Sequence, residues 1–191
     1  MGIEWGAGKA RHRTSNATWQ QPLTWERQHA KFFAVHGRRR RVFCASLADV
    51  FDNEVDHFWR IQLFEVIAKC RHLDWLILTK RVGNAMPMLN DVAARWPEFS
   101  ESSWSDNPWP HVWLGATIAN QEELERDGPK LRALPAAVRF ISYEPALGPL
   151  DFCGLWVPYT DIRVHENILE GIHWVIGGGE SGPRARAANP D

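Results

Sequence analysis

The chain has 191 residues, of which 45% are hydrophobic and 24% charged, a balance typical of one globular domain with a sizeable core. Its 22 basic and 23 acidic residues leave a formal net charge of −1, so no overall positive field exists to hold nucleic-acid phosphates. The sequence has no apolar run of membrane-spanning length and no signal-peptide pattern, and its three cysteines, Cys44, Cys70 and Cys153, are too widely spaced for a disulfide framework. These features predict a cytoplasmic protein with no membrane partner.

Residues 1–40 have almost no periodicity and are predicted to form an irregular N-terminal segment that packs on the rest of the chain. Within this segment, the apolar stretch from Trp19 to Trp25 is expected to act as the anchor. Four consecutive arginines, Arg38 to Arg41, end the segment. Because the chain is neutral overall, this run favours a solvated strand entrance over a phosphate contact. Residues 41–191 are predicted to form a single α/β domain.

Five short apolar runs that end in polar residues or glycine are predicted to be strands, at residues 41–46, 75–81, 112–117, 138–145 and 172–176. Helical periodicity lies between the first four of them. One helix is expected to begin after the N-cap Asn53, one to run from about Asn84 to Trp96, and one to begin after the N-cap Asn120. The pair Gly128–Pro129 is expected to break or kink the third helix.

Strands and helices that alternate at this spacing predict a parallel sheet built from right-handed crossovers. A complete eight-stranded barrel typically needs ~250 residues, so the predicted fold class is α/β, a partial and open parallel (β/α) barrel with about five strands. The edge strands of an open sheet carry unpaired N–H and C=O groups, which invite pairing. Residues 1–40 and 146–171 are expected to cover the open side, or, failing that, a homodimer is expected to form there.

Six motifs occur along the chain in a fixed order: Gly2–Trp5, Phe43–Phe51, Leu78–Arg81, Val112–Gly115, Ser142–Pro149 and Val175–Gly182. Together they resemble the phage gene-product 37/68 family (domain of unknown function 5131), which is found in phages, prophages and bacteria. The resemblance covers about Thr18 to Asp191. It implies a relative of radical S-adenosylmethionine (SAM) enzymes, with a (β/α) barrel or part of one, and makes SAM the candidate cofactor.

The sequence departs from the family pattern near its N-terminus. Members of the family typically carry a cysteine cluster there that could hold an iron–sulfur cluster, whereas residues 6–18 of this chain contain no cysteine. The helix and aromatic strand that usually follow the Gly-Glu-Ser-Gly segment are also missing. A shortened, non-radical member without an iron–sulfur cluster is therefore expected.

Nine residues at or just beyond the ends of three predicted strands form the candidate ligand site. They are Thr79, Lys80, Arg81, Glu144, Gly177, Gly178, Gly179, Glu180 and Ser181. Ligands of parallel α/β folds bind beyond the carboxyl ends of the strands, which would converge here.

Each part of this candidate site has two interpretations. The turn from Gly177 to Ser181 could cradle a phosphate or the amino-acid end of a SAM-like ligand through backbone N–H groups, or it could be only a tight βα loop. Lys80 and Arg81 could hold an anionic ligand, but pairing with Glu144 or Glu180 as counter-ions is favoured. Asp49 and Asp52 are further candidates for the same rim, although Asp52 is expected to help to cap the next helix.

Three classes of function follow. The first is a shortened phage or prophage protein that binds a small anionic or SAM-like ligand at the strand ends without radical chemistry. The second is a phage accessory or anti-defence protein that acts by binding a host or phage protein. The third is an active enzyme on nucleic acid or modified bases. The missing cysteine cluster and the neutral charge count against the third class. A function without catalysis is therefore favoured, and no catalytic residue is assigned.

Overall fold

The computed structural model describes residues 11–44, 48–96, 103–153, 155–156, 163–164, 167–180 and 185. Its helices are α1 (Asn16–Arg27), α2 (His29–His36), α3 (His57–Lys69), α4 (Val82–Ala93) and α5 (Gln121–Ala133). Its strands are β1 (Arg40–Cys44), β2 (Leu73–Thr79), β3 (Val112–Thr117), β4 (Val138–Tyr143), β5 (Leu155–Trp156), β6 (Arg163–Val164) and β7 (Trp174–Gly177).

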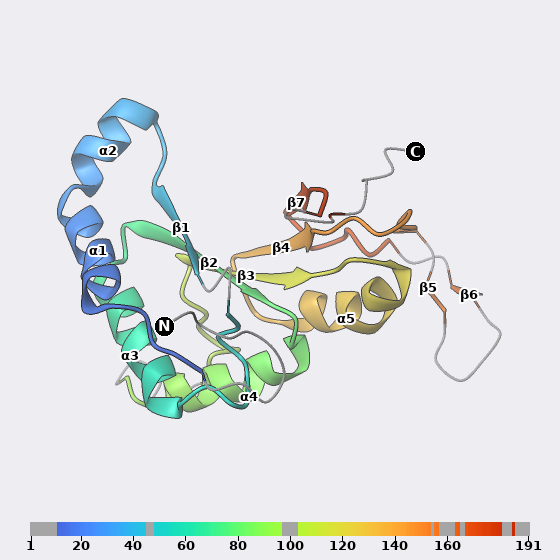
Figure 1. The fold of residues 1–191 in the computed structure, drawn as a ribbon, viewed down its shortest axis with the longest axis horizontal. Helices are drawn as coiled ribbons and strands as arrows, with labels where there is room; N and C mark the ends of the chain where they lie inside the picture. The colour runs from blue at the N-terminus through green and yellow to red at the C-terminus, as the bar shows by residue number, and fades with distance from the viewer. Residues whose placement is uncertain are drawn as a thin grey trace.

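Five of these strands form one parallel sheet in the order β1-β2-β3-β4-β7, and β5 pairs with β6 in a separate antiparallel ribbon. Helices α3, α4 and α5 connect consecutive strands and lie on one side of the sheet (Figure 1). The prediction of an α/β fold with an open parallel half-barrel of five strands is confirmed. All five predicted strands are present, each within a few residues of its expected bounds.

The core lies between the sheet and its helices. Phe64 and Ile67 of α3 meet Trp75 and Ile77 of β2 there, all almost fully buried. Strand β2 has neighbours on both sides, which explains why almost every residue in its apolar run is buried. Trp104, in the connection before β3, is also fully buried, so a tryptophan from a loop completes this core.

The prediction of an irregular segment over residues 1–40 is wrong for residues 16–36, which form α1 and α2. Ser15 caps α1 by accepting a hydrogen bond from the backbone N–H of Thr18, at 3.3 Å. Only a narrow stripe of α1, including Leu23 and Trp25, packs against the core. A stripe this narrow leaves little helical periodicity in the sequence, although the anchor expected from Trp19 to Trp25 does lie in α1.

Of the break or kink expected at Gly128–Pro129, the break does not occur, because α5 continues to Ala133. Gly128 is buried against Ile168, whose Cδ1 would lie 3.2 Å from a Cβ at this position, so the close packing of this helix favours glycine. The start of α5 agrees with its prediction, since Asn120 Oδ1 accepts the N–H of Glu123 at 2.9 Å. Helix α3 begins later than expected, after the N-cap Asp56.

The two segments expected to cover the open side have different structures. Helix α2 lies beside β1 (Figure 1). In the described part of residues 146–171, Leu150 and Phe152 pack against the core and Ile168 is fully buried.

None of the described helices is long and apolar enough to cross a membrane.

Candidate functional site

The candidate site residues lie along one edge of the sheet. Thr79 ends β2 and is followed by Lys80 and Arg81, Glu144 follows β4, and Gly177 ends β7 before Gly178, Gly179 and Glu180. Because all five strands are parallel, these positions are at the carboxyl-end edge, with β3 between β2 and β4. Ser181 lies outside the described residues.

Asp49 organises the part of this edge beside β2. Its Oδ1 accepts a hydrogen bond from Thr79 Oγ1 at 2.7 Å, and its Oδ2 accepts the backbone N–H of Lys80 at 3.0 Å. Arg81 Nη1 lies 3.3 Å from the same Oδ2, and the Arg81 backbone N–H donates to Thr79 Oγ1 at 2.8 Å. The Asp49 carboxylate thus fixes the end of β2, and Thr79 and Arg81 are engaged within the protein.

Asp52 extends this network. Arg11 and Arg81 pair with Asp52 Oδ2 at 2.8 and 3.3 Å, and Asp52 Oδ1 accepts the N–H of Glu54 at 3.0 Å. Burial alone raises the pKa of Asp52, but the hydrogen bonds from Glu54 and Arg11 and the positive charge of Arg81 outweigh burial and hold that pKa below its usual value. Asp52 therefore stays ionised and, through its ion pair with Arg81, stabilises the carboxyl-end edge of the sheet.

The favoured pairing of Arg81 with Glu144 or Glu180 is wrong, because its counter-ions are Asp49 and Asp52. Sequence reasoning places both aspartates near the rim but does not connect them to Arg81. The order of the motifs could have indicated this pairing of Arg81, because the first βα loop of a parallel sheet lies next to the end of the neighbouring strand. The cap expected from Asp52 is supplied by Asp56.

The second part of the edge joins β4 to β7. Ser142 Oγ donates to Glu144 Oε2 at 3.3 Å, Gly178 donates its N–H to Tyr143 O at 3.2 Å, and Ala146 donates its N–H to Gly178 O at 3.0 Å. A Cβ at Gly178 would overlap Glu144 Oε1, so the absence of a side chain at Gly178 leaves room for this carboxylate beside the end of β7. The structure therefore brings Glu144 and Gly178 together.

An aromatic group lies on the sheet face opposite the helices. Trp75, Leu114 and Ile141 belong to the helix-side core, so residues that alternate with them along the strands point the other way. This second set, which we call the aromatic face, consists of Phe43, Trp113, Phe140 and Trp174. Ring centroids are 6.4 Å apart for Phe43 and Phe140, 6.0 Å for Phe140 and Trp174, and 6.4 Å for Trp113 and Trp174.

The aromatic face is partly open to solvent. Phe43 is 42% exposed, whereas Phe140 is fully buried. Arg41 places its guanidinium over Trp113 and Trp174, at 5.2 and 5.0 Å from their ring centroids.

The aromatic face is continuous with the carboxyl-end edge of the sheet, which we also call the charged edge. Phe140 and Ser142 of β4 point to the same face, and Glu144 follows them in the chain. This group is not among the candidate residues predicted from the sequence. Period-two alternation in β3 and β4 is the signal that could have revealed it.

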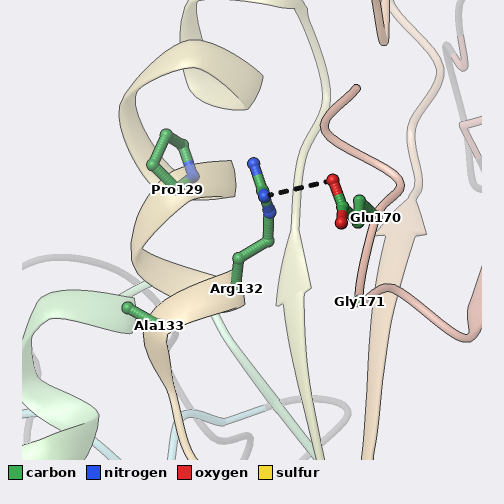
Figure 2. Close-up of a pocket in the computed structure, with 5 residues that line it drawn as sticks. All are labelled: Pro129, Arg132, Ala133, Glu170 and Gly171. Carbon is green, nitrogen blue, oxygen red and sulfur yellow. Dashed lines mark ion pairs between the residues drawn. The ribbon is translucent and has the colours of Figure 1, made fainter. Parts of the chain in front are cut away.

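A hollow of about 460 Å³ lies at the other edge of the sheet, between the end of α5 and the turn before β7 (Figure 2). Arg132 reaches across it toward Glu170, with Nη2 and Oε2 4.0 Å apart. Pro129, Ala133 and Gly171 complete its lining. None of the candidate ligand residues belongs to this hollow.

Comparison with known protein families gives a match along almost the whole chain. A family model described as "Protein of unknown function (DUF5131)" matches residues 2–191. No curated protein and no solved structure gives a significant match to the chain.

Proposed function

Because the chain belongs to the DUF5131 family of proteins of unknown function, we propose its function from the site itself: it is a binding module for a small ligand that carries both a flat ring and charged groups. S-adenosylmethionine is the ligand to test first. The observation that supports this proposal most directly is the continuity along β4 between the aromatic face and the carboxylate of Glu144.

The aromatic face supplies the proposed contact for the ring. A purine stacks favourably on tryptophan and phenylalanine, and each stacked base contributes about 1–3 kcal/mol of binding energy. Phe43 is partly exposed and thus available for such a contact. Arg41 adds a cation beside the rings, which suits an anionic group on the ligand as well as a stacked base.

The charged edge supplies the proposed contacts for the polar end of the ligand. Glu144 is exposed and suits an ammonium group, while Lys80 is exposed and suits a carboxylate. Glu180 and the backbone N–H groups of Gly179 and Glu180 are the remaining proposed contacts, since the Gly178 N–H already donates to Tyr143 O. Thr79 and Arg81 take a supporting role, because Asp49 and Asp52 already engage them.

The resemblance to a phage family related to radical SAM enzymes supports SAM as the test ligand. We propose binding without radical chemistry. Cys44 and Cys70 are buried and lie far apart in the sequence, so they do not provide the closely spaced thiolates that iron–sulfur clusters require. In this proposal the protein is a phage or prophage component located in the cytoplasm.

The test is calorimetry and thermal shift with SAM, adenosine and methionine. SAM and adenosine are both expected to bind and to raise the melting temperature. Trp174→Leu should weaken binding of both, whereas Glu144→Gln should weaken SAM at least tenfold and leave adenosine almost unchanged. Glu122→Gln, on the exposed side of α5, is the control and should change neither affinity. No binding of any of the three ligands at millimolar concentration would contradict the proposal.

Protein binding is a second candidate function, and the surface of α2 favours it. Phe33 is 54% exposed and Val35 70% exposed, on a helix at the opposite end of the molecule from β5 and β6 (Figure 1). An accessory or anti-defence protein could present such a helix to a host or phage protein. Phe33→Ser combined with Val35→Ser should abolish co-purification with that partner in infected cells and leave SAM affinity unchanged, which separates the two candidates.

A further inference from the structure

A second group of polar residues lies far from the proposed ligand site, at the edge of the sheet where β2 begins. Glu26 lies in the last turn of α1, His29 is the first residue of α2, and His72 lies between α3 and β2. Residues from two distant parts of the sequence thus meet where the N-terminal helices contact the sheet domain. None of the six motifs from Gly2–Trp5 to Val175–Gly182 contains any of them.

The three side chains have the arrangement of metal ligands. One ligand atom from each, two imidazole nitrogens and one carboxylate oxygen, lie within 4.8 Å of one another. His72 Nδ1 is 2.5 Å from Glu26 Oε1, and the His72 backbone N–H is 3.2 Å from Glu26 Oε2. The two imidazole rings are stacked, with centroids 3.8 Å apart and planes 8° apart. Two histidines and a glutamate form a donor set typical of zinc and related ions.

Hydrogen bonds to the backbone orient two of the three proposed ligands, His29 and Glu26. His29 Nδ1 is 2.8 Å from the backbone carbonyl of Glu26, which can only accept, so Nδ1 carries the proton and Nε2 carries the lone pair. Metal-binding histidines are commonly oriented in this way by a carbonyl behind the ring. Glu26 is likewise held by the His72 backbone N–H, which leaves part of its carboxylate available to an ion.

Burial and charge also suit a cation. The Glu26 side chain is 17% exposed and that of His72 is 59% exposed, so the carboxylate is sheltered while one ligand faces solvent and can move. The neighbouring guanidinium groups have other partners: Arg39 pairs with Asp74 at 3.2 Å, and Arg71 donates to the Ala68 carbonyl at 3.2 Å.

We propose that Glu26, His29 and His72 bind one divalent transition-metal ion, with zinc as the representative, and that the ion fastens the turn between α1 and α2 to the start of β2. On binding, the ion replaces the hydrogen bond between His72 Nδ1 and Glu26 Oε1: the imidazole carries its single proton on Nε2, so that the Nδ1 lone pair faces the ion and no net proton is lost. The exposed His72 ring turns out of the stack so that the ligand atoms reach about 2.0–2.2 Å from the ion. Water fills the fourth position.

The experiment uses the full chain without an affinity tag, dialysed against chelator. Zn²⁺ is titrated in competition with a chromophoric chelator, and Co²⁺ binding is followed by its visible spectrum. One equivalent of each ion is expected to bind at about pH 7.5, while Mg²⁺ should not compete because it prefers oxygen ligands. Affinity should fall as the pH is lowered, because protons compete with the ion for its ligands.

Four variants locate the ion. Glu26→Gln, His29→Gln and His72→Gln should each weaken Zn²⁺ binding at least tenfold. His57→Gln is the matched control, since His57 lies 3.1 Å from the Asp91 carboxylate without a second imidazole, and it should leave the affinity unchanged. Nitrogen NMR of the histidine rings provides a readout on the unmodified protein, with the His29 and His72 signals expected to move when Zn²⁺ is added.

Three results would overturn the proposal: no stoichiometric Zn²⁺ or Co²⁺ binding, binding unaffected by all three ligand variants, or ring signals of His29 and His72 that do not move at saturation. Circular dichroism of each variant separates a lost ligand from a lost fold. The NMR result decides the matter if a variant does not fold.

Discussion

At the level of single residues, the charges of Asp49, Asp52 and Arg60 are paired within the protein. Asp49 and Asp52 accept hydrogen bonds from the backbone and from arginines, and Arg60 donates to the carbonyls of Val50 and Asp52 at 2.9 and 3.1 Å. Charges that are buried and also paired hold one geometry, because any other arrangement leaves a charge without its partner. Residues 48–56, the described part of the connection between β1 and α3, therefore support the carboxyl end of β2.

The first prediction concerns the pH dependence of stability. The pKa of folded Asp52 lies below its unfolded value of about 3.9. Its stabilising effect is therefore fully present above about pH 4 and is lost as the pH falls through the folded pKa. Urea denaturation between about pH 7 and pH 3 should show that Asp52→Asn lowers the free energy of unfolding at neutral pH and flattens its decline in acid. The exposed Glu122→Gln should preserve the decline, and an equally steep decline in Asp52→Asn would contradict the prediction.

The second prediction concerns the thiols. Burial raises the pKa of Cys44 to about 12 and is the main cause that raises the pKa of Cys70 to about 11, whereas Cys153 is exposed. Ellman's reagent at about pH 8 should therefore label Cys153 quickly and the other two cysteines only after denaturation. Cys153→Ser should remove the fast phase. Rapid labelling of Cys44 in the native protein would mean that β1 does not bury its thiol.

At the element scale, close packing decides which side chains the sheet can hold. Gly115 of β3 lies directly beside Phe140 of β4 in the register, and a Cβ at Gly115 would overlap the Phe140 ring. Phe140 is fully buried and its ring contacts Trp174, so it has little room to move. The glycine in β3 thus provides the space for an aromatic ring from the next strand.

The third prediction tests this packing. Gly115→Ala should lower the free energy of unfolding by about 1–3 kcal/mol, because the added methyl group overpacks the sheet. Gly83→Ala is the matched control, because this glycine lies in α4 and a Cβ there would meet nothing within 4 Å. That substitution should stabilise the helix by about 0.5–1 kcal/mol. Both values come from urea denaturation, and a stabilising Gly115→Ala would show that Phe140 can shift.

At the scale of the whole molecule, the sheet of the open half-barrel has two outer strands, β1 and β7. Helix α2 lies beside β1, where Arg40 stacks on Phe32 at 4.2 Å. Among the described strands β7 pairs only with β4, and Val175 of β7 is 39% exposed. A strand edge with an exposed apolar residue invites pairing with another chain.

The fourth prediction follows from this difference between the two edges. Light scattering across a dilution series should show a homodimer at high concentration that dissociates on dilution, with β7 as the contact. Val175→Lys should shift the equilibrium to monomer, because a charge on an edge strand opposes pairing. Lys31→Glu, on the exposed surface of α2, is the control and should not affect it. A wild-type protein that is monomeric at every concentration would contradict this prediction.

The order of the elements can be predicted from the sequence because each strand is a short apolar run and each main helix has a wide apolar face. The bounds of α3 are less predictable, since Asp56 rather than Asn53 supplies its cap. Helices α1 and α2 escape prediction because few of their residues reach the core. The site is predictable in part: the edge that holds Thr79, Arg81 and Glu144 follows from parallel strands, whereas the partners of Arg81 do not.

The fold class, the five strands and the edge at which their polar ends lie can be read from the sequence, because apolar periodicity and the parallel crossover are properties of local sequence. Which charges pair, which tryptophans form the aromatic face, and the contact of His72 with Glu26, 46 positions away in the sequence, are seen only in the folded chain. The difference arises from distance along the chain. Hydrogen bonds and ring contacts depend on side chains within a few ångströms in space, and only the packed fold brings such residues together.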